Sequence, residues 1–275
     1  MREQRPTILV FDSGVGGLSV LAEIERQLPF VQIVYAGDDA AFPYGALPEE
    51  VLVDRIVRVM ERLIARFRPD LVVGACNTAS TIVLPHLRAR FELPFVGTVP
   101  PIKPAAMQSV SRLFSVLATP GTVTREYTRE LIATYAGDCR VNLVGAKRLA
   151  AFAEAELSGT PVSDDELRAE IAPCFVRDGE RRTDVVVLAC THFPLLVARM
   201  KRLAPWPVTW IDPAPAIARR AADLIGPRPT FSLMPEEDGL AVFTSGTSLT
   251  PALRSALAAR GLGALEIEPM PLAAL

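Results

Sequence analysis

The stretch Asp70-Leu-Val-Val-Gly-Ala-Cys76-Asn-Thr78 is an apolar run that ends in a cysteine followed by two polar residues. A similar stretch, Asp184-Val-Val-Val-Leu-Ala-Cys190-Thr-His192, occurs later in the chain, and five of its nine aligned positions are identical to the first. Short runs rich in valine predict buried strands. Two strands that each end in a thiol predict an active site with one thiol on each side of a substrate.

The length and composition indicate a globular protein. The chain has 275 residues, enough for one large domain or two of ordinary size. Half of the residues are apolar and the formal net charge is −2, so no global field favours nucleic acid or an anionic membrane surface. No apolar run reaches the roughly 18 residues needed to span a bilayer, and residues 1–6 lack a signal-peptide pattern. We therefore expect a cytoplasmic protein with neither nucleic-acid nor membrane partners.

Short β-branched runs alternate with amphipathic helical patterns along the chain. The expected strands are 7–11, 32–36, 71–75, 95–97, 114–118, 141–144, 185–189, 208–211 and 240–243. The expected helices include 51–67, 124–135, 164–176 with Ser163 as N-cap, 194–203 and 250–260. Apolar strands separated by helices predict an α/β fold with mainly parallel sheets, covered on both faces.

An internal sequence repeat predicts two domains. The first strand leads into Asp12-Ser-Gly-Val-Gly-Gly17, and the strand that ends at Ala118 leads into Thr119-Pro-Gly-Thr-Val-Thr124. Each half thus has a loop rich in glycine and hydroxyl groups before its cysteine strand. Prolines near 98–103 and again in 205–215 indicate where the chain changes domain. We expect two pseudo-symmetric, doubly wound domains, 1–98 with 208–275 and 99–207, and an active site in the cleft between them.

The candidate site residues follow the predicted strands. In parallel α/β sheets, ligands bind beyond the carboxyl ends of the strands. The polar and thiol residues expected at these ends are Asp12, Ser13, Cys76, Asn77, Thr78, Thr119, Cys190, Thr191 and His192.

Two facing thiols can invert a carbon centre. A thiol has a pKa of about 8.5, so a nearby base or helix N-terminus can make it a base near neutrality. One thiolate would remove a proton from carbon while the opposite thiol supplies another, and this scheme requires no metal or organic cofactor. We expect Asp12 to assist Cys76 and His192 to assist Cys190.

Other readings of the same residues are weaker. The glycine loop, with the spacing Gly14-x-Gly16-x-x-Ser19, lacks the third glycine of a dinucleotide-binding motif. The sequence has no Cys-x-x-Cys pair of the kind that binds structural zinc, so no metal site is expected. Cys139 and Cys174 are expected to be ordinary buried thiols. A stripe of basic residues is interleaved with acids and is interpreted as a solvated helix face; its members are Arg55, Arg58, Arg62 and Arg66.

The motifs resemble the signature segments of bacterial glutamate racemases. The matching segments are 12–17, 37–45, 75–78, 119–123, 190–194 and 243–246. The resemblance implies two α/β domains related by pseudo-twofold symmetry and interconversion of L- and D-glutamate without a cofactor. It also implies a supply of D-glutamate for peptidoglycan, and a homodimer. Carried onto this sequence, Cys76 and Cys190 are the acid/base thiols, and the residues around the substrate are Asp12, Ser13, Tyr44, Gly45, Asn77, Thr78, Thr191 and His192.

The chain departs from the family pattern at two places. Phe193 stands where many relatives have tyrosine. The Pro-x-x-Glu segment of many relatives is replaced by Val144-Gly-Ala-Lys147, so no role is assigned to the next acids, Glu154 and Glu156. Two alternative functions stay open. One is a racemase for another acidic amino acid or a hydantoin, and the other is a catalytically silent binding or regulatory relative, which would be expected to lose a thiol.

Overall fold

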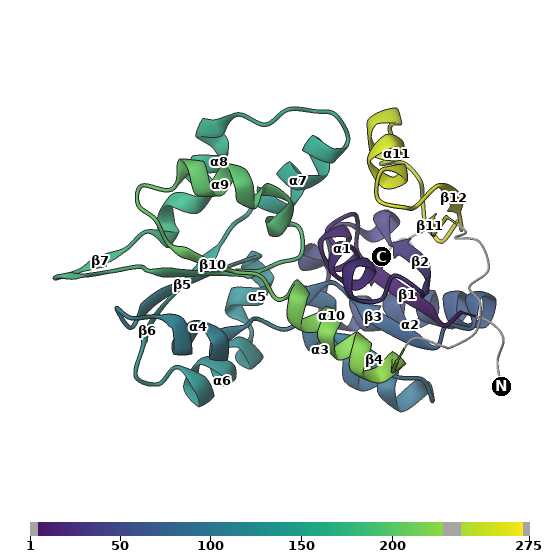
Figure 1. The fold of residues 1–275 in the computed structure, drawn as a ribbon, viewed down its shortest axis with the longest axis horizontal. Helices are drawn as coiled ribbons and strands as arrows, with labels where there is room; N and C mark the ends of the chain where they lie inside the picture. The colour runs from purple at the N-terminus through teal and green to yellow at the C-terminus, as the bar shows by residue number, and fades with distance from the viewer. Residues whose placement is uncertain (1–4, 228–237, 272–275) are drawn as a thin grey trace.

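The computed structural model of the chain describes residues 5–227 and 238–271. Residues 1–4, 228–237 and 272–275, which belong to the range expected for the first domain, lie outside the described residues. Two parallel sheets occupy separate halves of the molecule (Figure 1). None of the helices in the described ranges is long and apolar enough to cross a membrane.

Within residues 5–227 and 238–271, the first sheet has six parallel strands in the order β12-β11-β2-β1-β3-β4. Its strands are β1 (Thr7–Asp12), β2 (Gln32–Gly37), β3 (Leu71–Gly74), β4 (Phe95–Gly97), β11 (Leu240–Phe243) and β12 (Ala264–Ile267). Helices cover both faces, as expected for apolar parallel strands. One face packs against α1 (Leu18–Gln27), α10 (Ala214–Ile225) and α11 (Pro251–Ala258), and the other against α2 (Glu49–Phe67) and α3 (Asn77–Arg90).

The part of the chain that the structure describes forms a second sheet of four parallel strands in the order β10-β9-β5-β6. Its strands are β5 (Leu113–Ala118), β6 (Arg140–Gly145), β9 (Val185–Ala189) and β10 (Thr209–Ile211). Helices α7 (Leu149–Leu157), α8 (Asp164–Ile171) and α9 (Val197–Leu203) pack on one face, and α4 (Ile102–Gln108) and α6 (Glu126–Tyr135) pack on the other. A short helix, α5 (Pro120–Thr124), follows β5.

The two sheets share a strand order. In the first sheet, β1 lies between β2 and β3, and β4 lies beyond β3. In the second, β5 lies between β6 and β9, and β10 lies beyond β9. The cysteine strands β3 and β9 therefore hold equivalent places. The predicted α/β class with mainly parallel sheets is confirmed, and we propose that each sheet is the centre of one domain.

One domain boundary needs correction. The sequence placed residues from 208 onward in the first domain, but β10 pairs with β9 in the second sheet. The reason is that Thr209–Ile211 is the fourth strand of that sheet, and the chain returns to the first half only with α10 (Figure 1). We therefore propose that the second domain extends to Ile211.

Several predicted helices are shorter or divided. The helix expected over 124–135 is interrupted at Arg125, whose backbone is extended. The helix expected over 164–176 begins after Ser163 as predicted but ends at Ile171, because Pro173 lacks the N–H that a continuing helix needs; a 3₁₀ turn, η3 (Ala172–Cys174), follows. The helix expected over 194–203 starts as a 3₁₀ turn, η4 (Phe193–Leu196).

Some elements were not predicted. The edge strand β12 carries Glu266 between Leu265 and Ile267, and its residues are mostly exposed, so its apolar signal is weak. A two-stranded antiparallel ribbon, β7 (Arg177–Asp178) and β8 (Arg181–Arg182), projects from the second domain (Figure 1). Two further 3₁₀ turns, η1 (Asp39–Ala41) and η2 (Tyr44–Ala46), follow β2.

Candidate active site

The two repeated cysteines line one small cavity. Cys76 follows β3 and Cys190 follows β9, so each thiol stands at the carboxyl end of its strand. The cavity measures about 30 Å³, which leaves room for about two water molecules. Its lining residues are Ser13, Phe42, Pro43, Tyr44, Gly45, Cys76, Asn77, Thr78, Thr119, Ala150, Cys190, Thr191 and His192. The structure thus gathers all but one of the predicted site residues around one small cavity.

Asp12 is the predicted site residue that does not line the cavity. It ends β1 and is fully buried, and its Oδ2 accepts a hydrogen bond of 3.0 Å from the backbone N–H of Gly17. Among the described residues, its Oδ1 has no hydrogen-bond partner, and neither do the side-chain oxygen and nitrogen of Asn77. Buried polar atoms are normally paired, so these three atoms are available to a ligand or to ordered water.

Cys76 sits in an environment that keeps its thiol protonated. The residue is the N-cap of α3 and is 7% exposed. Burial, together with the nearby carboxylate of Asp12, raises the pKa of the Cys76 thiol far above its usual range. Oγ of Ser13 lies 4.0 Å from Sγ of Cys76. Cys76 is therefore suited to donate a proton first.

Cys190 has a basic neighbour. Its Sγ lies 3.8 Å from Nδ1 of His192. Burial works against a charged imidazole, but the contacts with Cys190 and Glu154 outweigh it and raise the pKa of His192 well above its usual value. A protonated His192 can donate a hydrogen bond to Sγ of Cys190 and stabilise negative charge on it.

Glu154 is the residue that the sequence analysis did not assign. It lies on α7, and its Oε1 lies 2.8 Å from Nε2 of His192. The same oxygen accepts a hydrogen bond of 2.8 Å from the backbone N–H of Val15, in the loop after β1. A signal existed, since Glu154 and Glu156 are the acids of α7, but only the folded chain shows which of them faces His192.

The glycine loop makes room for these side chains. A Cβ atom on Gly16 would overlap the imidazole ring of His192, and one on Gly14 would overlap the carboxylate of Glu154. Glycine is needed where two segments approach this closely. The loop therefore serves close contact between the two halves of the molecule, which fits its incomplete match to a dinucleotide-binding motif.

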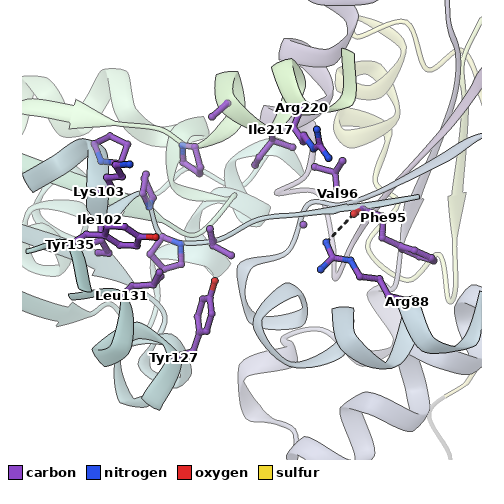
Figure 2. Close-up of a pocket in the computed structure, with 17 residues that line it drawn as sticks. Arg88, Phe95, Val96, Ile102, Lys103, Tyr127, Leu131, Tyr135, Ile217 and Arg220 are labelled. Carbon is purple, nitrogen blue, oxygen red and sulfur yellow. Dashed lines mark hydrogen bonds between the residues drawn. The ribbon is translucent and has the colours of Figure 1, made fainter. Parts of the chain in front are cut away.

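A larger cavity lies elsewhere. It measures about 550 Å³ and contains neither thiol. Figure 2 shows that its wall joins Arg88 and Val96 of the first domain to Tyr127 and Tyr135 of the second, with Arg220 from α10. Arg88 is held there by a hydrogen bond of 3.1 Å from Nη2 to the carbonyl oxygen of Phe95. We identify the candidate active site by its reactive groups and not by cavity volume. The two thiols and the unpaired polar atoms favour the smaller cavity.

The other cysteines are not alike. Cys174 is fully buried, and burial raises its pKa to about 12, as expected of an inert thiol. Cys139 is partly exposed, with Sγ 3.5 Å from Oδ1 of Asp138, so the expectation that it is buried was wrong. It follows the turn after α6, just before β6, and packs against the edge of the core. No group of three or more metal-binding side chains occurs in the described parts of the chain.

Comparison with known proteins agrees with this geometry. Two similar α/β units that enclose a pair of thiols are suited to an enzyme that moves a proton from one face of a carbon to the other. Residues 8–221 match the sequence pattern of the Asp/Glu/Hydantoin racemases, and the chain belongs to this family.

Individual relatives are similar over most of their length. The glutamate racemase of Brucella ovis is 54% identical over 243 residues, which cover 88% of this chain and 87% of the relative. A solved Escherichia coli glutamate racemase, in complex with L-glutamate and the activator UDP-MurNAc-Ala, has a TM-score of 0.89 and 42% identity over 97% of this chain and 99% of that one. RacE1 of Bacillus anthracis has a TM-score of 0.75 and 25% identity, over 96% and 97% of the two chains. The predicted resemblance and the predicted class of enzyme, an amino-acid isomerase, are confirmed.

Proposed function

We propose that this chain interconverts L- and D-glutamate by moving the Cα proton between two thiols, and that it supplies D-glutamate for peptidoglycan. The observation that carries the proposal is that Cys76 and Cys190 line one cavity from strands of different sheets. The similar Escherichia coli enzyme is described with L-glutamate, which supports glutamate as the substrate.

In one direction, the proposed reaction begins at Cys190, the thiol beside His192. With His192 protonated, Cys190 presents a thiolate, and its sulfur takes the proton from Cα of one enantiomer. Cys76, whose thiol is protonated, donates a proton to the opposite face of the planar carbanion. Cys190 ends as a thiol and Cys76 as a thiolate, so the electrons and protons balance. The reverse reaction starts from this second arrangement.

The substrate is held without an arginine clamp. No arginine or lysine is among the described residues that line the cavity. Hydroxyl and amide groups and the first backbone N–H groups of α3 are left to bind the charged groups of glutamate. The residues we assign to binding are Asp12, Ser13, Tyr44, Gly45, Asn77, Thr78, Thr119, Thr191 and His192.

The cavity also implies motion. Space for about two water molecules cannot hold an amino acid with five carbons. We therefore infer that the site widens when the substrate binds and closes around it. Closure would exclude water from the carbanion and strengthen the charge interactions around it.

Incubation with each glutamate enantiomer in deuterium oxide tests the proposal. We expect loss of optical activity from either enantiomer, and incorporation of solvent deuterium at Cα. The same assay with L- and D-aspartate separates glutamate from another acidic amino acid. If neither glutamate enantiomer loses optical activity, the proposed function is wrong; turnover of aspartate alone would favour the alternative racemase. The homodimer and the cytoplasmic location stay predictions.

A further inference from the structure

A buried ion pair joins α2 to the end of β2. Nε of Arg55 lies 2.9 Å from Oδ2 of Asp38, and Nη2 lies 2.5 Å from Oδ1, so the two groups meet through paired hydrogen bonds. Asp38 is fully buried and Arg55 is 9% exposed. Desolvation of two charges often cancels their attraction, so stability alone is a weak explanation for this pair.

Arg55 differs from the other arginines of its helix. The sequence placed all four of the stripe on a solvated face, and for Arg55 this was wrong. The side chain of Arg58 is 70% exposed and pairs with Asp54, while Arg62 and Arg66 pair with acids of the β12 segment at the surface. Arg55 points inward because it falls between Leu52 and Ile56 on the apolar face of α2.

Asp38 connects this pair to the substrate cavity. Its Oδ2 accepts a hydrogen bond of 2.6 Å from the hydroxyl of Tyr44. Burial and the Asp38 carboxylate raise the pKa of Tyr44 well above its usual value, so the phenol remains a donor. Tyr44 and Gly45 line the cavity together with Cys76. The place of this segment therefore depends on where the Asp38 carboxylate is held.

Arg55 is itself held from the far end of the chain. Nη2 donates a hydrogen bond of 2.6 Å to the carbonyl oxygen of Met270, and Nη1 donates one of 3.3 Å to that of Pro271. The Met270 N–H in turn donates to the carbonyl oxygen of Thr244 at 3.0 Å, and Oγ1 of Thr244 donates to Oδ1 of Asp38 at 2.7 Å. The guanidinium and the carboxylate thus belong to one closed ring of contacts.

We propose that Arg55 is a positioning residue, which, through Asp38, holds the Tyr44–Gly45 segment against the substrate, and that the carbonyl groups of Met270 and Pro271 keep Arg55 in place. The inference rests on the proposed function, because it concerns substrate binding at the same cavity. It places the control of substrate affinity partly at the C-terminal end of the described chain, more than 200 residues from Tyr44.

Kinetics of matched variants provide the first test. Without the guanidinium, Asp38 and Tyr44 lose their fixed geometry while both thiols stay in place. For Arg55→Met we expect KM for glutamate to rise about tenfold and kcat to stay within about threefold. Arg55→Lys keeps the charge but loses the paired hydrogen bonds, and we expect an intermediate KM. The control is Arg58→Met, on the exposed face of the same helix, with wild-type constants.

Chain-end variants test the contribution of the carbonyl groups. A chain that ends at Pro271 keeps both acceptors, whereas one that ends at Pro269 loses both. We expect wild-type KM for the first and a raised KM for the second. Met270→Ala removes the buried side chain but keeps the carbonyl group that accepts the hydrogen bond from Arg55. It therefore separates side-chain packing from hydrogen bonding, and we expect its KM to stay within about twofold of wild type.

Chemical labelling of Cys76 tests the same inference without depending on turnover. If the Tyr44–Gly45 segment is loosened, iodoacetamide should reach Cys76 about ten times faster in Arg55→Met than in wild type or Arg58→Met, since reaction needs local opening. Tyr44→Phe should raise this rate as well, and combining it with Arg55→Met should add little, because both act through one contact. Should Arg55→Met fail to fold, Arg55→Lys and Tyr44→Phe carry the test.

The outcomes separate the two proposals. If wild type racemises glutamate but Arg55→Met and Arg55→Lys keep its KM and its Cys76 labelling rate, the positioning role is wrong and the proposed function stands. If wild type racemises neither enantiomer, the proposed function is wrong, and the labelling rates alone decide the role of Arg55. A raised KM with faster Cys76 labelling supports the inference.

Discussion

Nε2 of His192 and the backbone N–H of Val15 both lie 2.8 Å from the same oxygen, Oε1 of Glu154. His192 follows β9 of the second sheet, whereas Val15 follows β1 of the first. One carboxylate therefore orients the imidazole beside Cys190 and joins the two halves of the molecule. If the proposed mechanism is right, opening of the cavity would break the bond to Val15, and the proposed acid–base pair of Cys190 and His192 would depend on closure.

Replacing Glu154 by glutamine should slow racemisation strongly. The amide keeps the shape but removes one of the partners that raise the pKa of His192, so we expect kcat/KM to fall about 10- to 100-fold. The equilibrium constant of a racemisation is one, so the fall must be equal from L- and D-glutamate. Initial rates from each enantiomer provide the measurement. Glu156→Gln is the matched control, since Glu156 lies on the same helix but pairs with Arg199; equal rates in both variants would remove Glu154 from the proton path.

Replacing each thiol by a hydroxyl should leave exchange of the Cα proton from a different enantiomer. Cys76→Ser and Cys190→Ser should each reduce racemisation by about three orders of magnitude, because a hydroxyl is a much weaker acid and base there. Each variant keeps the thiol for one face, so each should exchange the Cα proton of one enantiomer only, and the two variants should prefer opposite enantiomers. NMR of the Cα proton in deuterium oxide measures this. Exchange of the same enantiomer in both variants would contradict the two-thiol scheme.

The strands and thiols could be predicted because their signals are local. The cysteine strands are short valine-rich runs, and a polar residue after such a run marks a strand end wherever it occurs. The edge strand β12 was missed because it is mostly exposed and carries a charge, so it lacks the apolar pattern. Register and strand order were not predicted in detail, since they depend on pairings between distant segments.

The contacts that organise the site are of long range. Val15 and Glu154 are 139 residues apart, and Arg55 and Met270 are 215 apart. A buried arginine has the same helical spacing in the sequence as its exposed neighbours, so Arg55 was interpreted as part of a solvated face. What the sequence could have offered is the position of Arg55 between Leu52 and Ile56, on the apolar face of α2.

Gly16 should tolerate no side chain. The added Cβ of Gly16→Ala would overlap the His192 ring, which is buried and tied to Cys190 and Glu154. The ring or the loop must move, and we expect kcat/KM to fall about 100-fold, as misplacement of a reacting group by about 1 Å can cost. Gly137→Ala, whose Cβ would make only an ordinary contact, is the control. Wild-type kinetics in Gly16→Ala would show that this close approach does not limit the reaction.

Stability should fall with rising pH through His192. The hydrogen bonds to Cys190 and Glu154 outweigh burial and raise the folded-state pKa of His192 above its usual value of about 6.5. The folded chain then keeps a proton that the unfolded chain loses. This contribution is fully present below about pH 6.5 and is lost as the pH rises through the higher folded-state pKa.

Glu154→Gln isolates this contribution because it removes one partner that raises the pKa. Between pH 6 and pH 9 we expect the Tm of the wild type to fall more steeply than that of Glu154→Gln, so that the two curves converge at alkaline pH. Thermal unfolding followed by circular dichroism measures both curves, with Glu156→Gln as the control that should parallel the wild type. Parallel curves for Glu154→Gln and wild type would mean that Glu154 does not raise the pKa of His192, and the raised pKa would then have to come from its other neighbours, Cys190 and Asp12.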